Sequence, residues 1–229
     1  AKDAGGCVIL QHAGNETFFE AQDAQAAMDA AVEGDTLVFA EAELGSYPTI
    51  TMNKKVYIVT SRALYIDLDI PGNPSLDECL FISYSDWVSI SIKSDLQRLY
   101  LNDTFVYVYA NTENVTVGSL EMDCCCCWGI WYNSGLKKIV ANNSQIMWNL
   151  NPSDENDAVE SAKFTNCHFE MGQLNITNAT FNNCILRYTG DSQFTIVGCT
   201  FNKCLMNNKN VWVMGEGSSK TDYYDLDGD

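Results

Sequence analysis

The sequence is poor in basic residues. Its 229 residues include 13 Lys and Arg against 30 Asp and Glu, which gives a formal net charge of -17. Nucleic-acid binding needs a basic stripe that neutralises phosphates, so this balance excludes that class of partner. It also disfavours direct binding of an anionic polymer unless a cation bridges the two. A neutral ligand, or no ligand, suits the charge better.

Long apolar runs are also lacking, and no stretch is long enough to cross a bilayer as a helix. The sequence shows no signal peptide. Its opening residues, AKDAGG, are compatible with the mature end that remains after removal of one.

Potential metal ligands are few. The only histidines are His12 and His168, and the ten cysteines are fewer than a disulfide scaffold contains. Cys124 and Cys127 have C-x-x-C spacing inside the run CCCC, but no second pair follows at zinc-ribbon distance. A zinc site is therefore not expected.

One helix is predicted near the start of the chain. Thr17 and Glu20 make the S/T-x-x-E pattern of a capping box, and a stripe of Ala, Met and Val at helical spacing follows. Gly34 can take the left-handed conformation that ends a helix. We therefore expect an amphipathic helix at about 18–33.

After Gly34 the apolar period changes to two, which predicts short strands separated by turns. No later segment resembles a second helix of any length. The segment at about 149–161 is polar and is therefore expected to be a loop or insertion. The strand-like segments on both sides of it look alike, so we do not assign it as a domain boundary. The sequence thus predicts one domain over 1–229.

A six-residue phrase occurs three times: FTNCHF at 164–169, ITNATF at 176–181 and IVGCTF at 196–201. Its third residue, Asn or Gly, tolerates left-handed backbone angles, and the small residue and Phe that follow share one face of a strand. Each copy alone cannot bury that face, but stacked copies can, which indicates a β-solenoid. The first two copies lie too close for a full coil, so their bends can be different corners of neighbouring coils.

Residues 18–60, with AAMDAAVEGDTLVFAEAELGSYPTITMNKKVYIVTS, resemble the opening of right-handed parallel β-helix proteins of the pectin-lyase-like superfamily. The Asn/Cys/Phe pattern at 164–206 resembles later coils of such proteins. The resemblance implies a right-handed parallel β-helix with an N-terminal capping helix. The chain is also similar to uncharacterised secreted or surface β-helix proteins of Gram-negative bacteria, which implies a secreted, periplasmic or cell-surface location.

The catalytic motifs of that superfamily's lyases and hydrolases are not recognisable. The three arginines, Arg62, Arg98 and Arg187, lie in no such motif, and no Asp-Asp or His-Gly pair occurs. Asp67 and Asp69 can share one side of a strand, where an exposed acidic edge is the favoured interpretation. We therefore assign no catalytic residue.

The run CCCC at 124–127 allows two interpretations, a disulfide or soft-metal site and a structural role. Alternate residues of a strand point to opposite faces, so the structural interpretation buries two of the cysteines as small apolar residues and leaves two outside. We favour it because no converging ligands are in view. The single cysteines at 167, 184, 199 and 204 are expected to be interior.

Aromatic side chains are the better binding candidates, because exposed rings on a long solenoid face can stack on sugars. The candidate ligand-binding residues are Trp128, Trp131, Tyr132 and Trp148. Trp128 and Trp131 differ in strand parity, so one of them is expected to face outward. Core packing is the competing interpretation for each.

The C-terminal D-x-D-G-D, with Asp225, Asp227 and Asp229, is a fragment of a calcium loop without the remaining ligands. A solvated acidic end is the favoured interpretation, so Ca2+ is only a weak cofactor candidate.

Three functions remain open. The first is a non-catalytic secreted or surface protein that binds a polysaccharide or a surface protein along a solenoid face. The second is a polysaccharide lyase or glycoside hydrolase with unrecognised catalytic residues, which rests on fold analogy alone. The third is a structural or adhesive module of a surface assembly.

Overall fold

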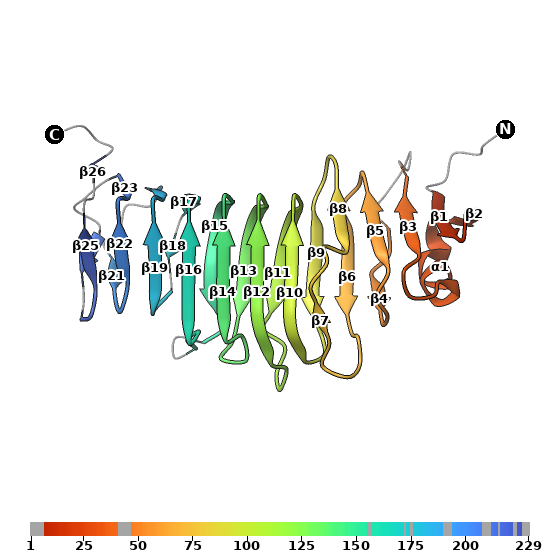
Figure 1. Cartoon of the computed structure of the whole chain (residues 1–229), viewed down its shortest axis with the longest axis horizontal. Coiled ribbons are helices and arrows are strands. Elements are labelled where there is room, and N and C mark those ends of the chain that lie inside the picture. Colours follow the sequence, from red (N-terminus) through yellow and green to blue (C-terminus); the bar gives the residue numbers. More distant parts are fainter. Residues whose placement is uncertain are drawn as a thin grey trace.

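The alternating segments form a stack of strands that winds into a β-solenoid of about seven turns (Figure 1). This computed structural model describes residues 7–40, 47–154, 157–171, 173–174, 176–189, 194–207, 212–214, 216–221 and 224–225. Within these residues only the pairings of β1 (Cys7–His12) are antiparallel, and all other strand pairs are parallel. The expected fold, a parallel β-solenoid, is confirmed.

Two sheets follow one another along one side of the solenoid. In the described part of the chain, the first has five strands: β2 (Asn15–Glu20), β1, β3 (Thr36–Phe39), β5 (Tyr57–Thr60) and β8 (Phe81–Ser83). The second has eight strands: β25 (Ser219–Thr221), β22 (Thr200–Asn202), β19 (Ala179–Asn182), β16 (Ser161–Thr165), β14 (Lys138–Asn142), β12 (Val117–Asp123), β10 (Leu96–Asn102) and β7 (Ser75–Leu76).

A third sheet, with eleven strands in the described residues, forms another side of each coil. Its strands are β4 (Ile50–Met52), β6 (Leu64–Leu68), β9 (Val88–Ile92), β11 (Phe105–Ala110), β13 (Cys126–Tyr132), β15 (Gln145–Pro152), β17 (His168–Met171), β18 (Gln173–Leu174), β20 (Ile185–Tyr188), β23 (Leu205–Met206) and β26 (Tyr224–Asp225). A separate pair joins β21 (Phe194–Ile196) and β24 (Trp212–Met214).

The first described strands form a β-hairpin where the sequence predicted the start of a helix. β1 and β2 join through a tight turn in which Ala13 and Gly14 have φ angles of 48° and 80°. Thr17, Phe18 and Phe19 are strong β formers, and the facing strand CVILQH pairs with their backbone. Strand pairing therefore outweighs the local capping-box pattern.

The helix is shorter than the predicted 18–33. After a 3₁₀ turn at Ala21–Asp23, α1 covers only Ala24–Ala30. No side chain caps the N-terminus of the 3₁₀ turn or that of α1. The predicted capping box of Thr17 and Glu20 is thus wrong.

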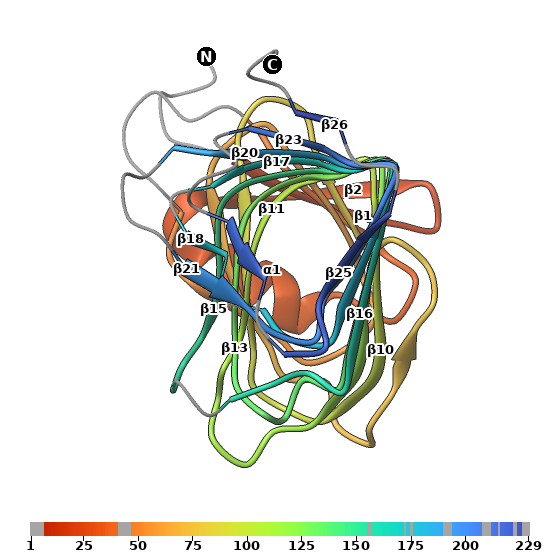
Figure 2. The same cartoon turned by 90° about the vertical axis from the view of Figure 1, so that its left-hand side faces the viewer.

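The buried side of α1 agrees with the predicted stripe, and it covers the N-terminal end of the coil stack (Figure 2). Ala24, Ala27 and Met28 are fully buried, whereas Val32, which was placed on the same stripe, is 50% exposed. The Lys54 ammonium donates to the Ala31 carbonyl at 2.8 Å and so ties the end of the helix to the first coil. A covered end matters because an open solenoid edge leaves unpaired strand groups.

The recurring phrase occupies two different corners. Asn166 has a φ of 54° between β16 and β17, whereas Asn178 and Gly198, with φ of 57° and 66°, precede β19 and β22. The close spacing of the first two copies is thereby explained. At the first corner the left-handed residues stack from coil to coil: the Asn166 amide donates to Asn143 at 3.1 Å, and that of Asn183 to Asn166 at 2.8 Å.

The small residue and the Phe that follow each bend fill the interior, as predicted: the buried residues are Cys167, Phe169, Ala179, Phe181, Cys199 and Phe201. Phe164 precedes its bend and is buried as well. Phe164, Phe181 and Phe201 occupy equivalent positions in three coils, and their rings stack with centroids 5.0 and 4.7 Å apart. Cys167, Cys184, Cys199 and Cys204 are all buried. The predicted loop at 149–161 is shorter, because β15 continues to Pro152.

Candidate ligand-binding face

The outer side of β11 and β13 carries a cluster of aromatic rings. The cluster, here called the aromatic face, consists of Trp87, Phe105, Tyr107, Tyr109, Trp128 and Trp131, all half-buried. In β11 the alternation is strict: Phe105, Tyr107 and Tyr109 point outward, and Val106, Val108 and Ala110 are buried. Trp87 lies directly before β9, so three adjacent coils contribute rings.

A β-bulge places both tryptophans of β13 on this face. The register between β11 and β13 shifts after Val106, and the register between β13 and β15 shifts between Cys127 and Gly129, which leaves Trp128 as the extra residue. An extra residue resets the alternation of side chains along a strand. The prediction that only one of Trp128 and Trp131 faces outward is therefore wrong.

The rings contact one another across coils. Trp131 stacks on Tyr109 with a centroid distance of 4.9 Å and an interplanar angle of 10°, and it lies 5.7 Å from the Tyr107 ring. Trp128 lies 5.6 Å from Phe105 and 6.2 Å from Trp87. These contacts hold the rings in a fixed arrangement, so a ligand would meet a preorganised surface.

Polar groups flank the aromatic face on both sides. Trp131 is paired in register with Asn151 of the next coil, and Gly129 with Asn149. On the other side, β6 contributes Tyr65, which is 42% exposed, and Asp67, whose carboxylate lies 3.7 Å from the Lys93 ammonium. Amides, phenols and one neutralised carboxylate therefore surround the rings.

The phenols of the aromatic face stay protonated at neutral pH. Burial is the main cause that raises the pKa of Tyr107 and of Tyr109, and neighbouring phenols, including that of Tyr65, raise it further. A protonated phenol can donate or accept a hydrogen bond, so these tyrosines can match either side of a hydroxyl group.

The other residues that the sequence suggested for ligand or calcium binding are not seen on the aromatic face. Tyr132 is 1% exposed and points into the core, so it does not belong to the aromatic face. Trp148 lies in β15, but its side chain is outside the described part of the structure, as is that of Asp225 in β26. Asp227 and Asp229 lie outside the described residues.

The CCCC run has the structural arrangement that was favoured. Cys125 and Cys127 are buried, Cys124 is exposed at a bend, and Cys126 is half-buried with its sulfur 3.7 Å from that of Met147. Burial raises the pKa of the Cys125 thiol to about 12, so it stays protonated. Among the described residues no group of three or more His, Cys, Asp or Glu could hold a metal ion, and no helix is long and apolar enough to span a membrane.

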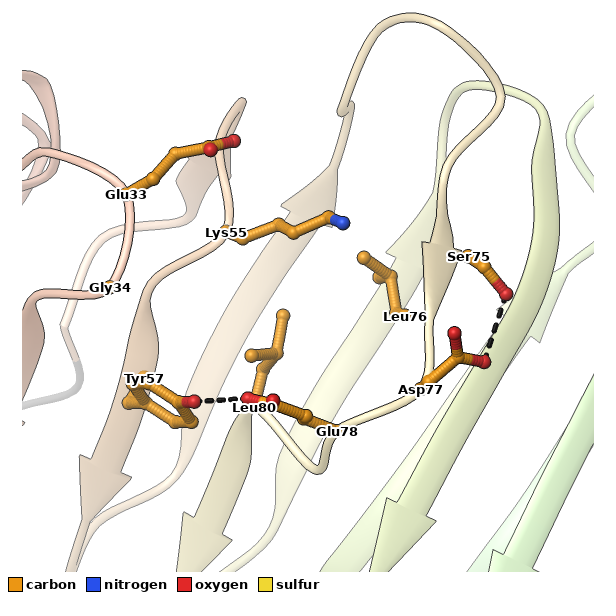
Figure 3. A pocket seen from close by; sticks show the side chains of 9 residues that line it. All are labelled: Glu33, Gly34, Lys55, Tyr57, Ser75, Leu76, Asp77, Glu78 and Leu80. Atoms are coloured by element: carbon orange, nitrogen blue, oxygen red, sulfur yellow. Dashed lines mark hydrogen bonds between the residues drawn. The ribbon is translucent and has the colours of Figure 1, made fainter.

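A separate groove of about 370 Å³ opens on the side of the solenoid formed by the five-stranded and eight-stranded sheets (Figure 3). Lys55, Tyr57, Leu76, Leu80 and Glu78 are among its lining residues. The Tyr57 phenol donates a hydrogen bond to Glu78, and that carboxylate raises the pKa of the phenol.

No protein-family model, curated protein or solved structure matches this chain. The fold and the aromatic face define its class: a parallel β-solenoid with a cluster of aromatic rings on one outer face.

Proposed function

We propose that this protein is a non-catalytic, carbohydrate-binding β-solenoid, and that its aromatic face holds a neutral polysaccharide. The observation that carries the proposal is the contact network of six half-buried rings on one outer face, with Trp131 stacked on Tyr109. Sugar rings present apolar C–H faces that pack on aromatic rings, while their hydroxyl groups need polar partners.

The surroundings of the rings support a sugar over a purely apolar ligand. Asn149 and Asn151 offer amides on one side, and the phenols of Tyr65, Tyr107 and Tyr109 offer hydroxyl groups. A binding surface that combines apolar area with a few polar groups is typical of specific small-ligand recognition.

The charge supports a neutral ligand over an acidic one. The chain carries a net charge of -17, and the carboxylate at the edge of the face, Asp67, is already paired with Lys93. A polyanion would therefore meet net repulsion at this protein. A secreted or cell-surface location, implied by the resemblance to β-helix proteins, would bring the face to such polysaccharides and is part of the proposal.

A thermal-shift screen tests the proposal. Neutral and acidic polysaccharides are added to the protein, each with and without calcium, and ligand binding to the native state raises Tm by mass action. We expect a shift with a neutral polysaccharide that does not depend on calcium. Trp131→Ala should abolish the shift, whereas Tyr84→Ala should retain it, because Tyr84 is 74% exposed and lies outside the aromatic face.

Product analysis on the same polysaccharide separates binding from catalysis. We expect the chain length of the polysaccharide to stay unchanged after prolonged incubation. Shortened or unsaturated products would contradict the non-catalytic assignment, and an equal shift for Trp131→Ala and wild type would contradict the assignment of the site.

A further inference from the structure

One coil of the solenoid is split on the side that is formed by the five-stranded and eight-stranded sheets. Between residues 75 and 83 the chain forms two short strands: β7 pairs with β10 of the following coil, and β8 pairs with β5 of the preceding coil. The five-stranded sheet therefore ends and the eight-stranded sheet begins within this coil. The groove lies at this division, between Tyr57 of β5 and Ser75 and Leu76 of β7 (Figure 3).

The groove has the size and the mixed lining of a small-molecule site. Its volume is about 370 Å³, which lies in the range of roughly 300–1,000 Å³ that such sites occupy. Leu76 and Leu80, which are 2% and 5% exposed, form a small apolar floor, and the ring of Tyr57 stands on one side.

The charges around the groove are only partly neutralised. Asp77 accepts hydrogen bonds from Arg98 at 2.8 Å and from Ser75 at 2.9 Å, so its charge is compensated. Glu78 is bonded only by the neutral Tyr57 phenol, among the described residues. Its carboxylate is thus available to a cationic group.

The Lys55 side chain extends into the groove between Glu33 and Leu76 (Figure 3). No described residue lies within hydrogen-bonding or ion-pair distance of its ammonium, and the same holds for the Glu33 carboxylate. The hydrogen bond from Arg98 is the main cause that lowers the pKa of Asp77, and the charge of Lys55 lowers it further, so the Lys55 ammonium lies within electrostatic reach of Asp77 without contacting it. Among the described residues, the groove thus presents one cation outside ion-pair distance of any carboxylate, and two carboxylates, Glu33 and Glu78, without a cationic partner.

We propose that this groove binds a small zwitterion that carries a primary ammonium and a carboxylate joined by a short apolar chain. The ligand's carboxylate pairs with Lys55, its ammonium lies at Glu78, and its methylene groups lie over the small exposed parts of Leu76 and Leu80. Because the lining carboxylates outnumber Lys55 and the chain is strongly acidic, an anion without an ammonium group is disfavoured.

Isothermal titration calorimetry with ε-aminocaproate tests the proposal, with caproate and hexylamine as matched probes that lack one charge each. We expect ε-aminocaproate to bind at least about tenfold more tightly than either probe, because each charged pair contributes a hydrogen bond to an ionised group. Lys55→Met and Glu78→Gln should each weaken its binding about tenfold or more. Lys163→Met removes the same charge from an exposed position on β16 and should leave the affinity unchanged.

Absence of binding heat for ε-aminocaproate up to millimolar concentration would overturn the proposal, as would equal affinities for wild type and Lys55→Met. Circular dichroism and Tm confirm that each variant is folded. The proposal is independent of the carbohydrate assignment, because Trp131→Ala should bind ε-aminocaproate as wild type does.

Discussion

Trp131 and Tyr109, on adjacent coils, occupy paired register positions, and their rings stack almost parallel with centroids 4.9 Å apart. Gly129 makes room for this stack. A Cβ atom at Gly129 would lie 2.7 Å from Cζ3 of Trp131, closer than two carbon atoms approach without displacement. The backbone at Gly129 thus defines where the Trp131 ring lies, two residues further along β13.

Gly129→Ala should weaken polysaccharide binding. The added methyl group must push the Trp131 ring away from Tyr109, and we expect about a tenfold loss of affinity, equivalent to about 1.4 kcal/mol. Near-ultraviolet circular dichroism should report the displaced ring, while Tm changes little because a side chain can shift. Ser91→Ala, paired with Tyr109 on its other side, is the control and should bind as wild type.

Ala27→Asp should expose the N-terminal end of the solenoid and cause aggregation. Ala27 is fully buried under α1, and an unpaired carboxylate at this position should destabilise the fold by about 3 kcal/mol or more. Ala26→Asp, on the exposed side of the same helix, introduces the same charge and should stay monomeric. Size-exclusion chromatography with light scattering checks both, and an unaltered monomeric Ala27→Asp protein would show that the helix is not a cap.

Asn166→Ala, at the bend between β16 and β17, should lower the free energy of unfolding by about 1–2 kcal/mol, because alanine is strained at a φ of 54°. The variant also loses the amide bonds to Asn143 and Asn183. Asn166→Gly loses the same bonds but tolerates the left-handed backbone, so it should be the more stable of the two. Urea unfolding measures both, and an equal loss would mean that the backbone angle contributes nothing.

Stability should fall in acid as Asp35 becomes protonated. Burial alone would raise the pKa of Asp35, but hydrogen bonds from the Val32 amide at 2.9 Å and from His12 at 2.7 Å, with the charge of Lys54, lower it below the usual 3.8. A depressed folded-state pKa gives stability that is fully present above the unfolded value and is lost as pH falls through the folded value.

Asp35→Asn should therefore be less stable than wild type at pH 7, by roughly 1–3 kcal/mol, and the difference should shrink between about pH 4 and pH 2. Urea unfolding across that range measures the difference. Asp23→Asn, at an exposed position, is the control. A constant difference between wild type and Asp35→Asn at all pH values would contradict the role of the ionised carboxylate.

The solenoid was predictable because its signals are local and repeated. Each copy of the phrase combines a residue suited to a left-handed bend with a small residue and a Phe at strand spacing, and the buried Phe169, Phe181 and Phe201 agree with that pattern. The helix boundaries were not predictable from residues 17–20 alone, since pairing with β1 decides their conformation.

The aromatic face was only partly predictable. The alternation in FVYVYA already indicates the outward Phe105, Tyr107 and Tyr109, a signal that the choice of three tryptophans and Tyr132 missed. The joint outward orientation of Trp128 and Trp131 depends on a bulge that is set by pairing with β11 and β15. The groove depends on the split of one coil between two sheets, which no residue pattern in 75–83 indicates.

The most direct test of the central claim is a tryptophan-fluorescence titration with a neutral polysaccharide, comparing wild type with the double variant Tyr109→Ala/Trp131→Ala. The account predicts a saturable spectral change in wild type and none in a folded double variant. Saturable binding of equal affinity in both proteins would contradict the claim that the aromatic face binds carbohydrate.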